Sequence, residues 1–133
     1  MAVLGLRHIE KPTDGKPGVA LIRAHGITDT LRQSFLEAGF TLIDGTCRNV
    51  QASQTIIRDT DRSDHVVIAG IAGHSETIAL AGVKDAGGNS IDCHVVQNTD
   101  DVHDLPDAQG TWILMTQTTL PASEYKAILQ AMK

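Results

Sequence analysis

Residues 65–71 read His-Val-Val-Ile-Ala-Gly-Ile (HVVIAGI), and this stretch decides the fold class. Its apolar run is continuous and rich in β-branched residues, which is typical of a short strand whose two faces are both covered. Such strands belong to parallel sheets that carry helices on both sides. The stretch therefore predicts an α/β fold in three layers, αβα, with a mainly parallel sheet.

Strand-like and helix-like stretches alternate on either side of this run. Short β-branched runs predict strands at 19–24, 40–44, 91–98 and 111–117, and longer amphipathic stretches predict helices at 29–39, 49–61, 75–88, 99–105 and 121–133. We expect a further strand at 2–6 (AVLGL), ahead of a turn-rich loop. Capping residues support two of the helix starts, with Thr28 or Asp29 at one and Thr99 or Asp100 at the other.

Composition limits the classes of function. The chain has 133 residues, a formal net charge of -5 and no stripe of basic residues, which argues against broad surfaces for nucleic acid or acidic membranes. No apolar run is long enough for a signal peptide or a membrane span, so we expect a cytoplasmic protein. Two cysteines are too few for a disulfide scaffold.

Polar and reactive side chains follow four of the predicted strands. They are His25 after 19–24, Cys47 after 40–44, His74 and Glu76 after 65–71, and Gln117, Thr118 and Thr119 after 111–117. In doubly wound sheets, ligands bind at the carboxyl ends of the strands, where loops and helix N-termini meet. If the sheet is parallel, all these residues lie at one edge and form a candidate site.

Each of these residues also has an ordinary explanation. Gln117, Thr118 and Thr119 can fix a polar ligand, but they can equally satisfy their own backbone at a helix entry. A histidine beside glycine can bind a phosphate oxygen, but His25 and His74 can equally be loop residues. Glu76 can be a proton donor or a first-turn glutamate that complements the helix dipole. A thiol at a helix start is favoured as thiolate, so Cys47 can ligate a metal, whereas Cys93 lies within a strand and reads as a buried apolar residue.

The blocks IRAHG, DGTC, GIAGHSET and MTQTTL, in this order, resemble the IspH/LytB family of 4-hydroxy-3-methylbut-2-enyl diphosphate reductases. The resemblance runs from about Val19 to the C-terminus. It implies a cloverleaf of three α/β units around a four-iron iron-sulfur cluster, held by one cysteine from each unit. It also implies a reaction that removes the substrate hydroxyl with two electrons and two protons, giving isopentenyl and dimethylallyl diphosphate in the non-mevalonate route to isoprenoids.

Matched block by block, the resemblance assigns a role to each residue. Cys47 is the cluster ligand, His25 and His74 bind the diphosphate, and Glu76 supplies a proton that Thr118 helps to relay. Gln117 and Thr119 belong to the substrate-binding side and shape its loop. The implied partners are a small diphosphate substrate and an electron donor such as ferredoxin or flavodoxin.

The chain also departs from the family pattern. The cysteine blocks that the family carries before and after this region are missing, and Arg48 and Ser75 stand where proline is usual. We therefore expect a central fragment, with 1–46 as the tail of the preceding α/β unit and 47–133 as the central unit. One thiolate cannot hold a four-iron cluster, so we expect no cluster and no activity from this chain alone.

Two other functions stay open. The chain can be a stand-alone phosphate-binding or interaction module that kept the fold and lost the cluster. It can also be a thiol redox protein that uses Cys47 and Cys93, although no CxxC motif brings them together in sequence, so we rank this last.

Overall fold

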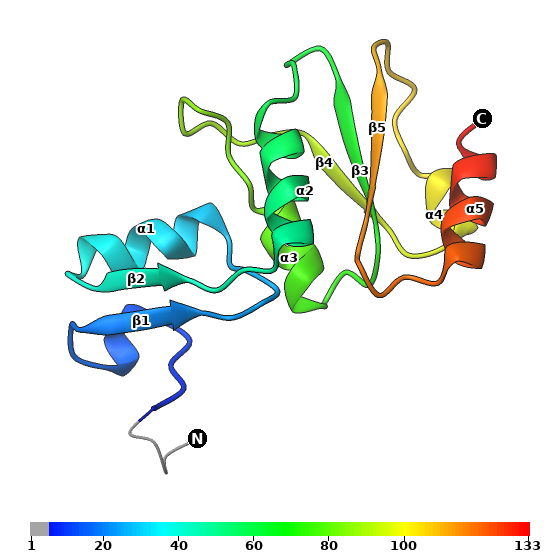
Figure 1. Cartoon of the computed structure of the whole chain (residues 1–133). Helices are drawn as coiled ribbons and strands as arrows, with labels where there is room; N and C mark the ends of the chain where they lie inside the picture. Colours follow the sequence, from blue (N-terminus) through cyan, green and yellow to red (C-terminus); the bar gives the residue numbers. More distant parts are fainter. Residues whose placement is uncertain (1–5) are drawn as a thin grey trace.

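The computed structural model describes residues 6–133, and its helices and strands alternate along that length (Figure 1). After a short 3-10 turn at Pro12–Asp14, the elements are β1 (Val19–Ile22), α1 (Asp29–Glu37), β2 (Thr41–Asp44), α2 (Arg48–Arg58), β3 (His65–Ala69), α3 (Ser75–Ala81), β4 (Cys93–Val96), α4 (Thr99–Val102), β5 (Trp112–Thr116) and α5 (Ala122–Ala131). The strand expected at 2–6 lies outside the described residues, apart from Leu6, which is not in a strand.

The strands form two parallel sheets. β1 pairs with β2, while β3 lies between β4 and β5 and is parallel to both. The predicted α/β class with parallel strands is thus confirmed. The strand exits, however, lie at the edges of two sheets and not of one, because β1 and β2 pair only with each other among the described residues. Figure 1 shows the smaller sheet with α1 on one side of the molecule and the larger sheet on the other.

The larger sheet is covered on both faces, as the run at 65–71 predicts. Val66 and Ile68 are fully buried in a cluster that α2 and α3 complete, and Val67 and Ala69 are fully buried in a second cluster that includes Ile128 of α5. Alternate residues of a strand point to opposite faces, so β3 supplies both cores. Fully burying one such aliphatic side chain contributes about 1.5 to 3 kcal/mol. β3 therefore gives the loop that follows it a rigid support.

Helix boundaries explain where prediction and structure differ. Thr28 caps α1, as expected, because its hydroxyl accepts a hydrogen bond from the N–H of Leu31 at 3.1 Å. Asn98, and not Thr99 or Asp100, caps α4 through its side-chain oxygen, which accepts from the N–H of Asp101 at 3.1 Å. α3 stops at Ala81, well short of the predicted end, and its next residue is Gly82.

Gly82 packs against the smaller sheet's helix. A Cβ added at Gly82 would lie 2.4 Å from the Thr28 side chain, and the N–H of Asp29 donates to the Gly82 carbonyl at 3.2 Å. The Asp29 carboxylate also accepts from the N–H of Lys84 at 2.8 Å and pairs with Arg58 at 3.2 Å. These contacts join the start of α1 to the ends of α2 and α3. They fix the smaller sheet against the larger one.

Within residues 6–133, no helix has the length and apolar character that crossing a membrane would require.

Candidate functional site

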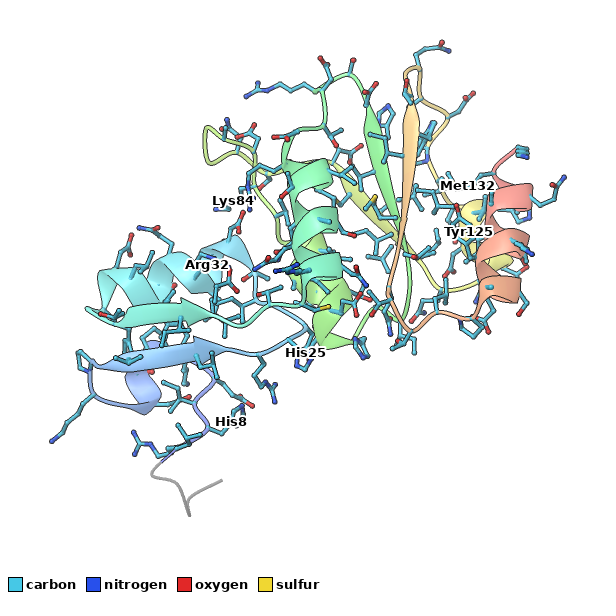
Figure 2. All side chains as sticks on the ribbon, in the orientation of Figure 1. His8, His25, Arg32, Lys84, Tyr125 and Met132 are labelled. Carbon is cyan, nitrogen blue, oxygen red and sulfur yellow. The ribbon has the colours of Figure 1, made fainter. Side chains whose placement is uncertain are left out.

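The loop after β1 carries His25 and is tied to the loop that carries Cys47. Gly26 closes a turn with its N–H donating to the Arg23 carbonyl at 3.0 Å, in a left-handed conformation (φ 76°) that favours glycine. The N–H of Cys47 donates to the Ala24 carbonyl at 2.8 Å. The residue before His25 is therefore hydrogen-bonded to the backbone of Cys47. Figure 2 shows His25 at this junction, near α2 and α3.

Cys47 occupies the N-cap position of α2. Its thiol is free and exposed, and it makes no capping hydrogen bond, so the positive end of the helix dipole faces an available sulfur. Cys93 is also a free thiol, but it is half-buried. It lies in β4 against the core shared by α2 and α3, and burial raises the pKa of its thiol to about 11. The two cysteines thus differ in exposure, and the metal-ligand role of Cys47 stays a prediction.

His74 caps α3 with its own ring. The Nδ1 atom accepts a hydrogen bond from the N–H of Glu76 at 3.1 Å, so a neutral ring must carry its proton on Nε2. That N–H remains to donate to a ligand. The rings of His25 and His74 lie 6.4 Å apart between centroids, in an edge-to-face arrangement. The two sheets thus bring their histidines together.

His25 carries an unsatisfied polar atom. Its Nε2 is buried and has no hydrogen-bond partner among the described residues. Leaving a buried polar atom unpaired costs about 1 to 3 kcal/mol. Such atoms are rare in folded proteins and mark places where a ligand or ordered water completes the bonding. The ring is therefore suited to a site that takes up a polar ligand.

Glu76 is held by Thr118 across the gap between α3 and the exit of β5. One carboxylate oxygen accepts from the Thr118 N–H at 2.7 Å, and the other accepts from the Thr118 hydroxyl at 2.8 Å. Glu76 is only 4% exposed although Thr118 is exposed. Both oxygens are thus oriented toward the side chain that reaches the surface.

Gln117 and Thr119 are hydrogen-bonded to each other in the loop after β5. The Gln117 side chain is 4% exposed, its oxygen accepts from the N–H of Ile71 at 3.0 Å, and its nitrogen donates to the Thr119 hydroxyl at 2.6 Å. The amide of Gln117 is therefore engaged by its own protein. These hydrogen bonds are consistent with the predicted role of Gln117 and Thr119 in shaping the loop. Their direct contact with a substrate stays a prediction.

The predicted residues form one connected set. Backbone contact links Cys47 to the loop of His25, the rings link His25 to His74, a hydrogen bond links His74 to Glu76, and two more link Glu76 to Thr118. We call these five residues the rim. Four loops from two sheets are thus connected to one another through these contacts.

As a metal centre, the rim is incomplete. Within residues 6–133 no group of three or more His, Cys, Asp or Glu side chains is placed to hold a metal ion. The single exposed thiol of Cys47 fits one corner of a cluster and no more. Two hollows of about 470 and 300 Å³ lie elsewhere, beside β4 and beside the Asp85–Asn89 turn, and no rim residue lines either.

The sequence model of the family described as LytB protein matches residues 1–133, the entire chain. The chain belongs to the LytB family. A LytB relative from Treponema denticola, named 4-hydroxy-3-methylbut-2-enyl diphosphate reductase, is 35% identical over 140 residues, which cover 98% of this chain and 47% of the relative. A relative of the same name from Alkaliphilus oremlandii is 34% identical over 91% of this chain and 42% of its own length.

Solved structures agree with this assignment. The E-1-hydroxy-2-methyl-but-2-enyl-4-diphosphate reductase from Plasmodium falciparum superposes with a TM-score of 0.81 at 25% identity, over 94% of this chain and 39% of that one. A second reductase, described as the terminal enzyme of the non-mevalonate pathway, gives 0.72 at 25% identity, over 86% of this chain and 40% of that one. The chain thus spans about half the length, or less, of the LytB relatives it matches.

The two departures from the LytB proline pattern fall at equivalent places. Arg48 is the first residue of α2 and Ser75 is the first residue of α3. Proline is favoured at the first helical position because the N–H there has no partner in the helix. Other residues are tolerated at that position for the same reason. Both helices begin there without proline.

Thr77 supports the site, and the sequence analysis did not predict it. Thr77 is fully buried in α3, next to Glu76, and its hydroxyl donates to the Gln117 oxygen at 3.1 Å. A signal for it existed in the sequence: Thr77 lies three residues before Leu80, on the apolar side of the helix. A polar residue at such a position needs a buried partner.

Proposed function

We propose that this chain forms the central part of a 4-hydroxy-3-methylbut-2-enyl diphosphate reductase and contributes one cluster cysteine and part of the diphosphate site. In this proposal residues 1–46 end the preceding α/β unit of a three-unit cloverleaf, and 47–133 form the central unit. The pairing of β1 with β2 alone, and of β3 with β4 and β5, supports that division.

His25 and His74 would bind the diphosphate. Their rings approach to 6.4 Å from two different sheets, and the N–H at Nε2 of a neutral His74 is unused by the protein. Diphosphate oxygens are strong acceptors, so two imidazole donors would each make a charge-assisted hydrogen bond.

Glu76 and Thr118 would deliver a proton to the leaving hydroxyl. Protonated Glu76 would donate to the Thr118 hydroxyl, which would pass its own proton to the substrate oxygen, so that the oxygen leaves as water. Carbon–oxygen cleavage also consumes two electrons and a second proton. The short bonds between Glu76 and Thr118, 2.7 and 2.8 Å, support this role because they align the two groups before substrate arrives.

Cys47 would be one ligand of a four-iron iron-sulfur cluster, whose other cysteines would come from outside this chain. When bound, such a cluster supplies electrons and a Lewis-acidic iron that engages the substrate hydroxyl. An external donor such as ferredoxin or flavodoxin would recharge it. The exposed, uncommitted thiol at the start of α2 supports the ligand role.

The observation that carries this proposal is the series of contacts along the rim, which runs from Cys47 through the backbone beside His25 to His74, Glu76 and Thr118. Its test begins with inorganic pyrophosphate, titrated calorimetrically into the chain. We expect His25→Ala and His74→Ala each to weaken binding about tenfold or more, the effect of one lost charge-assisted hydrogen bond. His103→Ala, an exposed histidine on α4's C-terminal side, is the matched control and should bind as the parent does.

The cluster is tested separately. Anaerobic reconstitution with iron and sulfide, followed by visible absorption, should give no stable cluster on this chain alone, and a stoichiometric brown product would overturn that expectation. In a complete reductase containing this chain, Cys47→Ser should abolish activity. Unchanged turnover would rule out Cys47 as a ligand.

A second candidate is a stand-alone phosphate-binding module. It is favoured by the approach of His25 to His74 within this one chain, which needs no cluster. The two functions differ in their dependence on Cys47. If a reductase containing this chain turns over only with Cys47 intact, the module is excluded, whereas tight pyrophosphate binding together with a dispensable Cys47 favours it.

A further inference from the structure

A second cross-link runs beside the contact between Glu76 and Thr118. The hydroxyl of Thr77 donates to the side-chain oxygen of Gln117 at 3.1 Å, and both residues are buried, at 0% and 4% exposure. Thr77 follows Glu76 in the sequence, and Gln117 precedes Thr118. Adjacent residues of α3 thus bond to adjacent residues at the exit of β5. One of the two links is shielded from water, and the other ends at the exposed Thr118.

The orientation of the Gln117 amide is fixed by its partners. The backbone N–H of Ile71 can only donate, so the atom 3.0 Å away must be the amide oxygen. The amide nitrogen then faces the Thr119 hydroxyl at 2.6 Å. Gln117 therefore joins three segments: the loop after β3, the first turn of α3 and its own loop. A rotation of the amide by half a turn would oppose donor to donor at Ile71.

The absence of a side chain at residue 70 makes room for this arrangement. A Cβ on Gly70 would lie 2.8 Å from the Thr77 hydroxyl oxygen and 2.9 Å from both the Cβ and the oxygen of Gln117. Gly70 is itself buried, and its N–H donates to the Val96 carbonyl at 3.0 Å. Backbone and side chains are thus closely packed around the hydrogen bond between Thr77 and Gln117.

We infer that Thr77 and Gln117 are positioning residues, a buried hydrogen-bonded pair that holds the start of α3 against the exit of β5 and so sets the Glu76 carboxylate on Thr118. Water can compete for the exposed Thr118, but it cannot reach the pair beneath. With the pair broken, the contact between Glu76 and Thr118 would be the remaining hydrogen-bonded link between α3 and the exit of β5 among the described residues. The consequence for proton transfer rests on the proposed function, whereas the positioning itself does not.

Isosteric variants of Thr77 test the inference. Thr77→Val keeps the shape and removes the hydroxyl, and Thr77→Ser keeps the hydroxyl and removes the methyl. The readout is amide hydrogen exchange of Thr118, whose N–H is bonded to Glu76, measured by NMR on the whole chain. We expect exchange about five- to tenfold faster in Thr77→Val, as for the loss of about one net hydrogen bond, and near-parental exchange in Thr77→Ser. The amides of Val67 and Leu114 report on global stability.

Two outcomes overturn the inference. One is unchanged Thr118 exchange in Thr77→Val, and the other is equal acceleration in both variants, which would assign the effect to packing of the methyl group. If Thr77→Val does not fold, Gln117→Met removes the acceptor from the opposite side and is judged by the same amides. Pyrophosphate affinity is measured in parallel. A parent chain that does not bind pyrophosphate refutes the proposed function, while the Thr118 amide still decides the role of the buried pair.

Discussion

Replacing Gly70 with alanine adds one methyl group at the most crowded point beneath the rim. The new Cβ would approach the hydroxyl of Thr77 to 2.8 Å and the side chain of Gln117 to 2.9 Å, closer than carbon atoms tolerate. Thr77 is fully buried and cannot swing away. The Cβ of Gln117 is fixed to the backbone beside β5, so relief requires a shift of the β5 exit.

The cost can be estimated from these contacts. Overpacking a filled interior by one methyl costs about 1 to 3 kcal/mol, and losing the buried Thr77 hydrogen bond adds about 1 kcal/mol. The sum is about 2 to 4 kcal/mol. For a chain of this size, with roughly 4 °C of Tm per kcal/mol, that corresponds to a fall in Tm of about 8 to 16 °C.

Gly73 offers a matched control three residues away in the same loop. A Cβ there would meet nothing within 4 Å, and the residue is exposed. Gly73→Ala should therefore unfold within about 0.5 kcal/mol of the parent, as surface substitutions do. Urea and thermal unfolding, followed by circular dichroism, compare the three proteins. Equal stability of the Gly70 and Gly73 variants would refute the packing argument.

Three further predictions concern other parts of the chain. A hydrogen bond to Asp92, then one to the Gln109 carbonyl, raises the pKa of His65 above its ordinary value of 6.5, so its stabilisation is complete below about pH 6.5 and is lost as pH rises through the folded-state pKa. Urea unfolding midpoints, measured at steps of about one pH unit from pH 6 to 9, should fall more steeply with rising pH for the parent than for His65→Gln. Parallel curves for the two proteins would contradict this. Because burial raises the pKa of Cys93 to about 11, iodoacetamide at mildly alkaline pH should label Cys47 and spare Cys93 in the native chain, and mass spectrometry showing equal labelling would disprove the difference. Asp29→Ala should cost about 2 kcal/mol, since it removes the bond to the Lys84 N–H and the pair with Arg58, whereas Arg58→Ala, which loses only a half-exposed ion pair, should cost about 0.5 kcal/mol; equal losses by urea unfolding would be inconsistent with that.

Local patterns predicted the fold well where one rule acts alone. The apolar run at 65–71 specified a strand buried on both faces, and β3 is that strand. The sequence predicted Thr28 or Asp29 as the cap of the first long helix, and Thr28 caps α1. The prediction for the cap of α4 was wrong by one residue. Asn98 displaces Thr99 and Asp100 as the cap of α4, and all three are residue types that cap helices.

Long-range packing set the features that no local pattern contains. α3 ends at Ala81 because Gly82 lies directly against Thr28, more than fifty residues earlier in the chain. The division into two sheets depends on which strands pair, and strand content alone does not fix pairing.

In the candidate site too, local features could be predicted from the sequence and long-range contacts could not. The loop positions of Cys47, His25 and His74 came from strand exits and from resemblance, because each is a local property. The buried partnership of Thr77 with Gln117 joins residues forty positions apart. Only the folded chain reveals which buried hydroxyl meets which amide.

The convergence of four loops on one ligand is tested most directly by an NMR titration of the whole chain with inorganic pyrophosphate. We expect the amide shifts to concentrate at His25, Cys47, His74 and Thr118 and to saturate together with a single dissociation constant. Shifts confined to one of these loops, or centred instead on the hollow beside β4, would contradict it.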